Sequence, residues 1–356
     1  MLRIPTEQDI DAAWFTEMLN QHGISATVDH ISAQQIGTGQ IGKCVRYTLS
    51  YTAGDGPATL IVKYPSDDPT SRATGVMLRN FYKEVRFYQQ MQSRLQINTP
   101  TCYFAEIVDE GPEFAVVMAD LSPAEQGDQL QGCDVDTATA AVLQLVGLHA
   151  PSWCDVELRQ LDWLGNAEIT DVNAMRDLYQ SQLPGFLERY GPNLSQDECD
   201  IIAAVGEAEH APLYDRDPSI FSLVHVDYRL DNLLIQPLPG GLPQVTVVDW
   251  QSITLGAPLN DVAYFMGAGL LPERRRACEE DIVRQYYDAL CAAGVTSFSW
   301  QDCWLGYRRG VFAGFGVTVV ASMLVQQTER GDAMFTAMAQ RHARHAIDLN
   351  GAEFLV

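Results

Sequence analysis

The stretch VHVDYRLDN at residues 224–232, followed by VTVVDW at residues 245–250, bears most directly on the fold of this 356-residue chain. It places a histidine, an aspartate and an asparagine at H-x-D-x-x-x-x-N spacing, and a second aspartate directly after an apolar strand. Sites of phosphoryl transfer use this spacing for a catalytic base and two ligands of Mg²⁺. The alternative interpretation is an ordinary strand, turn and strand with polar residues in the turn.

Four residues of these stretches are candidates for chemistry. Asp227 is the candidate catalytic base, which would accept the proton of an attacking hydroxyl group. Asn232 and Asp249 are the candidate ligands of a Mg²⁺ ion that neutralises a bound triphosphate. His225 joins the candidate catalytic set, with the expected role of orienting the loop through hydrogen bonds rather than moving a proton.

Composition and charge restrict the classes of partner. The length suggests two lobes or domains, and 47% hydrophobic residues are enough for a sizeable core. A net charge of −23 argues against nucleic acids and anionic membrane surfaces as partners. Eight cysteines without a C-x-x-C pair favour reduced thiols in the cytoplasm over a zinc site or a disulfide framework. The uncharged residues 310–328 contain Gly, Ser, Thr and Gln, which favours a buried helix over a membrane span.

Hydrophobic periodicity divides the chain into a strand-rich part and a helix-rich part. Apolar alternation and turn signals predict strands over 28–36, 43–51, 58–64, 101–108 and 114–118. Helical spacing predicts an N-terminal helix over 5–22 that begins at Thr6, and further helices over 81–95, 138–149, 170–190, 197–210, 276–294, 302–327 and 332–350. After residue 120 only 222–250 is rich in strands. The expected fold class is α+β, with a small β-rich lobe at 1–118 that binds nucleotide and a larger, mainly helical lobe at 119–356 that carries catalysis and substrate.

The glycines Gly37, Gly39 and Gly42 form a G-x-G-x-x-G motif between two predicted strands. Because a Rossmann motif is followed by a helix, this position favours a glycine-rich hairpin folded over phosphates, with a plain glycine hairpin as the alternative. Lys63 is one of three lysines in the chain and stands in the next apolar strand, where a phosphate-pairing lysine is expected. The alternative for Lys63 is an edge strand with the ammonium group in solvent.

Two further residues complete the expected nucleotide site. Glu84 lies on the predicted helix after the Lys63 strand and is the candidate partner of that lysine. The alternative is a solvated glutamate that pairs with Arg86 or Lys83. Met118 ends a predicted strand and is the candidate contact to adenine, which chain order alone supports. These residues predict ATP and Mg²⁺ as the cofactors.

The segment after Asp249 narrows the expected acceptor. Protein kinases place an activation segment and an A-P-E motif after the metal-binding aspartate, whereas here the next helix follows within a dozen residues. A small molecule is therefore the expected acceptor. Asp261 is expected to cap that helix or to brace the loop from behind. His149 is equally compatible with a hydrogen-bonded core histidine and with a functional one.

These motifs together resemble the aminoglycoside phosphotransferase and choline kinase superfamily, and in particular its ecdysteroid-kinase-like branch with the bacterial relatives. The resemblance is carried by the H-x-D-x-x-x-x-N motif, by VDWQ at 248–251 and by GAPLNDVAY at 256–264. Lys63, Glu84 and an L-H-x-x-x-W-like segment at 145–153 also fall at matching places. The resemblance implies a two-lobed, protein-kinase-like fold with ATP in the cleft, with Asp227 as the base and with Asn232 and Asp249 as magnesium ligands.

Two residues depart from the pattern of that superfamily. Val226 stands where glycine is usual, and Trp250 stands where many members have phenylalanine. Three functions stay open: an ATP- and Mg²⁺-dependent kinase of a small-molecule hydroxyl, a kinase of hydroxy acids or hydroxyacyl thioesters, and a nucleotide-binding module without catalysis. The acceptor is expected among 150–190 and 300–345. The sequence names neither the acceptor nor the oligomeric state, and it does not distinguish ATP from GTP.

Overall fold

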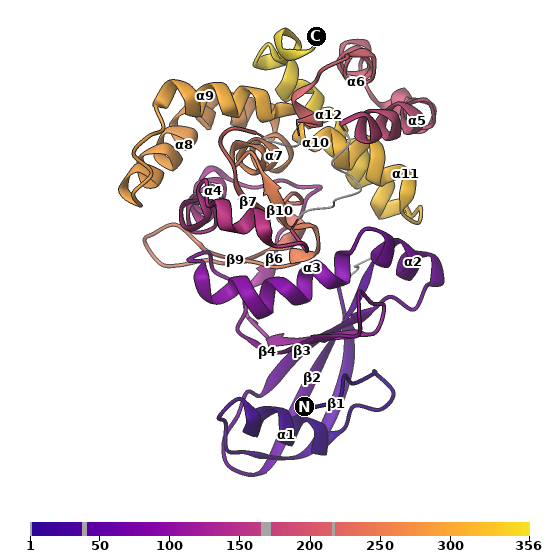
Figure 1. Cartoon of the computed structure of the whole chain (residues 1–356), viewed down its shortest axis with the longest axis vertical. Coiled ribbons are helices and arrows are strands. Elements are labelled where there is room, and N and C mark those ends of the chain that lie inside the picture. Colours follow the sequence, from indigo (N-terminus) through magenta and orange to yellow (C-terminus); the bar gives the residue numbers. More distant parts are fainter. Residues whose placement is uncertain (1, 38–40, 165–171, 216–217) are drawn as a thin grey trace. The chain divides into compact units, whose positions relative to one another are not determined.

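The structure, a computed structural model, describes residues 2–37, 41–164, 172–215 and 218–356 (Figure 1). These residues form two compact units. The first comprises Met1–Arg94, Thr99–Pro123 and Asp249–Ser252, and the second Leu95–Asn98, Ala124–Val248 and Ile253–Val356. The assignment of nucleotide binding to residues 1–118 and of substrate binding to residues 119–356 stays a prediction.

An antiparallel sheet of five strands, in the order β1-β2-β3-β5-β4, is the centre of the first unit (Figure 1). Its strands are β1 (Thr27–Ile36), β2 (Gly42–Ala53), β3 (Thr59–Pro65), β4 (Cys102–Ile107) and β5 (Phe114–Ala119). Strand β2 buries every second residue at Val45, Tyr47 and Leu49, which is the alternation of a strand with one face in the core. The predicted strands of this part are all confirmed.

The N-terminal helix α1 (Ala12–Gln21) packs its apolar residues into the same core as β2. The prediction that this helix begins at Thr6 is wrong. The side chain of Asp11 caps the helix by accepting a hydrogen bond of 2.8 Å from the backbone nitrogen of Trp14. The backbone nitrogen of Thr6 instead donates to the carboxylate of Asp9 in a preceding turn.

The helical region after β3 joins a distant segment of the chain. It consists of α2 (Pro69–Met77), which the sequence did not predict, and α3 (Asn80–Arg86), followed by a π-helical turn over Phe87–Met91. A 3₁₀ turn over Gln92–Arg94 continues it, so the predicted helical segment over 81–95 is confirmed to within one residue. The Phe87 ring stacks on Trp250 with centroids 3.9 Å apart and planes at 7°. Asn80 donates to the carbonyl of Gln251 at 3.0 Å, so residues 249–252 belong to the first unit.

The second unit is mainly helical. Its long helices are α4 (Val135–His149), α5 (Val172–Tyr190), α6 (Gln196–Glu207), α7 (Leu259–Gly269), α8 (Pro272–Ala292), α9 (Trp300–Arg309) and α12 (Glu329–Asp348). Its strands are β6 (Glu125–Gln126), β8 (Leu233–Gln236) and β9 (Gln244–Val247) in one sheet, and β7 (Ser222–Val224) paired with β10 (Thr254–Gly256) in another. The helices predicted near these places are confirmed, except that residues 170 and 171 lie outside the described residues. The α+β fold class is also confirmed.

The helix predicted over 302–327 is present from Trp300 to Leu324, but its hydrogen-bond pattern changes along its length. Helix α9 continues at Arg309 into a 3₁₀ turn over Gly310–Phe312, then α10 (Ala313–Phe315), the π-helical Gly316–Ala321 and α11 (Ser322–Leu324), with right-handed helical dihedrals at each junction. A methyl group on Gly310 would lie 2.8 Å from the carbonyl oxygen of Leu259, and one on Gly314 would lie 2.2 Å from the His342 ring. These glycines permit a close approach to α7 and α12. None of the helices in the described ranges has the length and apolar character needed to span a membrane.

Candidate functional site

The loop of residues 225–232, named here the catalytic loop, joins β7 to β8 and holds the carboxylate of Asp227 from several sides. The hydroxyl of Tyr264 donates to Asp227 Oδ1 at 2.8 Å. The Asn232 side chain donates to Asp227 Oδ2 at 3.0 Å and to its carbonyl oxygen at 2.8 Å. Arg229 approaches Oδ1 to 3.5 Å, and the Asp227 side chain keeps 17% of its surface exposed. The candidate base is thus fixed in direction and accessible.

The backbone before Asp227 is strained and is held by one carboxylate. Val226 has φ of +73°, which is a rare conformation for a β-branched residue. Asp261 accepts hydrogen bonds from the backbone nitrogens of His225 and Val226 at 2.7 and 2.9 Å. The predicted bracing contact is therefore present. The alternative prediction, that Asp261 caps its helix, is wrong because Pro258 is the N-cap residue of α7.

Two buried histidines lie next to this brace. His225 Nε2 lies 3.0 Å from the carbonyl oxygen of Val248, which ties the catalytic loop to the end of β9. This contact is of the kind expected for an orienting residue, and the catalytic assignment of His225 stays a prediction. His149 contacts the Tyr286 hydroxyl at 2.7 Å through Nδ1 and Asp261 at 3.4 Å through Nε2. The structure therefore favours a core role for His149, behind Asp261.

The side chain of Asn232 offers an amide oxygen that could bind a Mg²⁺ ion. Its side chain is buried, and both of its hydrogen bonds within the described residues use the amide nitrogen Nδ2. The amide oxygen is therefore the atom with remaining capacity. Oxygen atoms of carboxylates and amides are the ligands that Mg²⁺ uses, so Asn232 fits the predicted role.

In the first unit, Lys63, Glu84 and Asp249 form one cluster. Lys63 Nζ lies 2.7 Å from Glu84 Oε2 and 2.8 Å from Asp249 Oδ1. Burial by itself lowers the pKa of Lys63, but the carboxylates of Asp249 and Glu84 outweigh it and raise the pKa, so the ammonium stays charged. Burial raises the pKa of Glu84, and Lys63 partly offsets this effect. Strand β3 lies between β2 and β5, so the alternatives of an edge-strand lysine and a solvated glutamate are wrong.

Asp249 reaches this cluster through an unusual backbone. Its φ is +66°, directly before the Trp250 ring that stacks on Phe87. Its side chain retains 26% exposure, whereas that of Glu84 retains 1%. Of the two carboxylates at Lys63, Asp249 is therefore the more accessible, and its role as a metal ligand stays a prediction.

The last glycine of the glycine motif, Gly42, lies close to the Lys63 side chain. A methyl group on Gly42 would lie 2.9 Å from Lys63 Cε and 3.3 Å from the carbonyl oxygen of Tyr64, so a side chain at this position would displace the Lys63 side chain. Gly37 has φ of +70°, and Gly39 lies outside the described residues. Met118 is buried on β5, opposite Ile61 of β3. The phosphate and adenine contacts of these residues stay predictions.

Two contacts of the catalytic loop were missed by sequence reasoning. Tyr264 lies three residues after Asp261, so both share a face of α7, and this spacing was an available signal. The side-chain oxygen of Gln129 accepts a hydrogen bond of 3.0 Å from the backbone nitrogen of Leu230. The backbone nitrogen of Gln129 donates to the Asp231 carboxylate at 3.1 Å. Gln129 lies about a hundred residues before the loop, and its neighbouring sequence gave no signal.

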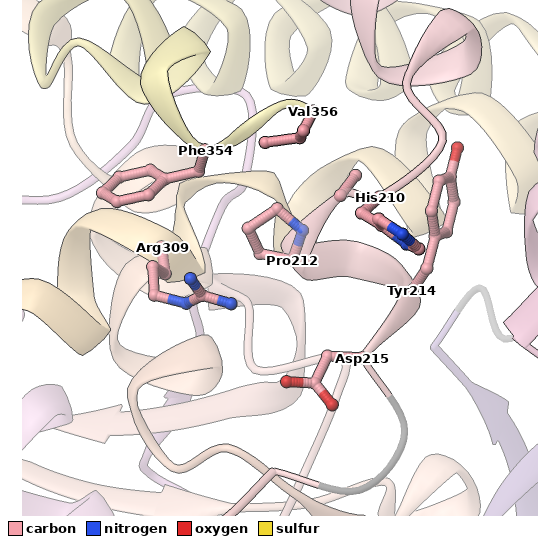
Figure 2. A pocket seen from close by; sticks show the side chains of 8 residues that line it. His210, Pro212, Tyr214, Asp215, Arg309, Phe354 and Val356 are labelled. Carbon is pink, nitrogen blue, oxygen red and sulfur yellow. The ribbon is translucent and has the colours of Figure 1, made fainter.

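A separate hollow of about 440 Å³ lies in the second unit (Figure 2). Its lining consists of His210, Ala211, Pro212, Tyr214, Asp215, Arg309, Phe354 and Val356. Two backbone hydrogen bonds of 2.7 and 3.0 Å join His210, which follows α6, to the C-terminal residue Val356. The lining includes none of the residues predicted for phosphoryl transfer, so this hollow is distinct from the candidate site.

One protein family matches most of the chain. The ecdysteroid kinase-like family matches residues 38–294, a range that includes every candidate site residue except Gly37. The chain belongs to the ecdysteroid kinase-like family. This membership agrees with the resemblance predicted from the motifs at 224–264.

Solved structures share the fold of this ecdysteroid kinase-like chain. A protein from Ralstonia eutropha, assigned to the aminoglycoside phosphotransferases, is 18% identical with a TM-score of 0.50 and covers 94% of this chain and 97% of its own. Choline kinase from Cryptosporidium parvum is 11% identical with a TM-score of 0.55, over 90% of this chain and 89% of its own. These similarities establish the kinase-like fold.

A curated relative adds a longer protein to this comparison. The uncharacterized oxidoreductase dhs-27 of Caenorhabditis elegans is 25% identical over 315 residues, which are 80% of this chain. The match covers 38% of the relative, so the present chain spans about two-fifths of the length of that protein. The name of the relative describes the whole of that protein.

Proposed function

We propose that the chain is a kinase that transfers the γ-phosphate of ATP, with Mg²⁺, to a hydroxyl group of a small molecule. The observation that carries the proposal is the Asp227 carboxylate, which Tyr264 and Asn232 hold while it stays partly exposed. A general base must be oriented and must reach the proton it accepts. Membership of the ecdysteroid kinase-like family supports the same reaction class.

The nucleotide side of the proposal rests on the first unit. Lys63, held by Glu84, would bind the α- and β-phosphates as a charged ammonium group. The glycine motif, from Gly37 through Gly39 to Gly42, would cover the phosphates with its backbone, and Met118 would contact adenine. The stacked Phe87–Trp250 pair fixes the segment that carries Asp249.

Asn232 and Asp249 would hold the Mg²⁺ ion through oxygen atoms, and the bound ion would neutralise the charge of the triphosphate. Asp227 would accept the proton of the acceptor hydroxyl while the hydroxyl oxygen forms a bond to the γ-phosphorus. The bond between that phosphorus and the bridging oxygen of ADP would break, which leaves a phosphate ester and ADP. Positioning and electrostatic stabilisation would supply most of the rate.

The test is consumption of ATP with Mg²⁺ by the full chain against a panel of amino sugars, hydroxy acids, hydroxyacyl thioesters, choline analogues and sterols. We expect at least one acceptor to raise ADP production, and Asp227→Asn to lower this rate at least about a thousandfold because the base is lost. The matched control is Asp288→Asn, at an exposed carboxylate on α8, with a wild-type rate. Wild-type turnover in the Asp227→Asn protein would overturn the proposal.

A nucleotide-binding module without catalysis is the alternative of another class, and Val226 is the feature that favours it. Val226 adopts a positive φ, so valine keeps the backbone in a conformation that glycine reaches without strain. This alternative predicts that ATP raises the melting temperature while neither the wild type nor Asp227→Asn produces ADP.

A further inference from the structure

Helix α7 contacts three consecutive residues of the catalytic loop. Asp261 accepts from the backbone nitrogens of His225 and Val226, at 2.7 and 2.9 Å. One turn later, the Tyr264 hydroxyl donates to Asp227 Oδ1 at 2.8 Å. Because residues three apart share a helix face, one face of α7 holds both the backbone of the loop and the carboxylate of the candidate base.

The Tyr264 hydroxyl is a permanent donor to this carboxylate. Burial raises the pKa of Tyr264 well above its ordinary value, and the negative charge of Asp227 raises it further. The phenol is therefore protonated near neutral pH. Its ring is buried and lies 5.2 Å from the ring of His342 on α12, so packing fixes the position of the hydroxyl.

The two oxygens of the Asp227 carboxylate each accept one hydrogen bond from a described residue, and Arg229 additionally lies near Oδ1. Oδ1 faces the Tyr264 hydroxyl at 2.8 Å and Arg229 at 3.5 Å. Oδ2 accepts one hydrogen bond from a described residue, that of Asn232 at 3.0 Å. Since each carboxylate oxygen accepts about two hydrogen bonds, Oδ2 has the capacity for one more donor.

We propose that Tyr264 is a positioning residue that occupies Asp227 Oδ1 and so assigns Oδ2 as the atom that accepts the proton of the acceptor hydroxyl. This inference rests on the proposed function. The proton moves from the acceptor oxygen to Oδ2, while the hydrogen bond from Tyr264 persists on Oδ1 and holds the carboxylate in one orientation. The titratable and charged groups that face this hydroxyl are Asp227, Arg229, Asp261 and His342.

The test is Tyr264→Phe, which removes the hydroxyl and keeps the ring. We expect kcat to fall about 10- to 100-fold because the carboxylate loses its orientation, with KM for ATP within about twofold of wild type. The control is Tyr179→Phe, a buried tyrosine on α5 whose hydroxyl donates to the carbonyl of Ile202 at 2.9 Å.

A second measurement does not depend on turnover. The melting temperatures of Tyr264→Phe, Asp227→Ala and the double variant should be non-additive, because both single changes remove the same hydrogen bond. Additive losses would overturn the contact, and an unchanged kcat in Tyr264→Phe would overturn the positioning role. Turnover that survives Asp227→Asn would instead overturn the proposed function, and it leaves the thermal coupling as a separate result.

Discussion

At the scale of single residues, Lys63 illustrates how burial turns an ion pair into a determinant of both stability and binding. Its ammonium group contacts the carboxylates of Glu84 and Asp249. The side chain is buried, and it stands on β3, an inner strand of the sheet. Removing one partner of a buried pair leaves an uncompensated charge, which is costly. The residue type was readable from the sequence, whereas the contact with Asp249 spans 186 positions of the chain.

We predict that Lys63→Ala weakens ATP binding about 10- to 100-fold, because a charged hydrogen bond to phosphate is lost. It should also lower the free energy of unfolding by about 3 kcal/mol, because Glu84 stays buried without its partner. Calorimetric titration with ATP and Mg²⁺ and urea denaturation measure the two effects.

Lys43→Ala is the matched control for that variant. Lys43 is a buried lysine on β2 that pairs with Glu7 and Asp67. It should lose stability but keep wild-type ATP affinity. Equal ATP affinity in the Lys63→Ala and wild-type proteins would contradict the role of Lys63 in nucleotide binding.

Val226 is a second residue whose effect depends on conformation rather than on contacts. Its φ of +73° costs an L-residue with a branched side chain about 1–2 kcal/mol, which glycine avoids. Glycine adds about 0.5–1 kcal/mol of chain entropy to the unfolded state, so the two terms nearly cancel. We predict that Val226→Gly leaves the free energy of unfolding unchanged or raises it by up to about 1 kcal/mol, as measured by urea denaturation.

The comparison for this prediction is Val156→Gly. Val156 is exposed in a short 3₁₀ helix and its φ is not positive, so glycine brings no relief there. This variant should lose about 0.5–1 kcal/mol. A larger loss in Val226→Gly than in Val156→Gly would show that the loop conformation is not strained.

At the scale of elements, helix α12 brings two buried histidines against α7. A single methyl group on Gly267 would lie 2.7 Å from the His342 ring and 2.8 Å from the His345 ring. The glycine on α7 therefore leaves room for both rings. Burial lowers the pKa of His342 to about 3 and that of His345 to about 4. Both rings are therefore neutral in the folded protein near pH 7.

This pair predicts acid sensitivity. An unfolded histidine has a pKa near 6.5, so between about pH 6.5 and pH 4 the unfolded state binds up to about two more protons than the folded state. Stability is then fully present above about pH 6.5 and falls as the pH decreases, by up to about 1.4 kcal/mol per pH unit for each histidine. Urea denaturation from pH 7.5 to 4.5 measures the slope.

His342→Leu should remove about half of that slope, because one of the two neutral rings no longer titrates in the unfolded state. The control is His30→Leu, an exposed histidine on β1, which should keep the wild-type slope. The same slope in the His342→Leu and wild-type proteins would contradict the assignment.

Elements differed in how well the sequence predicted them, for a physical reason. The strands of the first unit were predicted correctly because one face is buried, which imposes period-two alternation on β2. The helix predicted over 302–327 runs from Trp300 to Leu324, because its apolar spacing continues past Arg309. The sequence did not predict its change to 3₁₀ and π-helical hydrogen bonding near Gly310 and Gly314, two glycines that lie close to other helices.

At the scale of the whole molecule, the order of the motifs along the chain predicted the ecdysteroid kinase-like family, and the match over residues 38–294 confirms it. The glycine motif, Lys63, Glu84, the catalytic loop and Asp249 follow one another as a kinase-like fold requires. The compact units divide these residues in another way, since Asp249 lies with Lys63 in the first unit and Asp227 lies in the second. Function at this scale is tested by ATP consumption in the presence of acceptors.

The sequence by itself determined the fold class, the order of the chemical residues and the reaction class to be tested. These follow from residue type, spacing and hydrophobic period, which are local properties of the chain. Only the tertiary structure decided that Asp261 braces the loop, that Tyr264 holds one oxygen of Asp227 and that Asp249 joins Lys63. Such contacts depend on where side chains meet after burial and packing, and distant residues along the chain carry no spacing that records them.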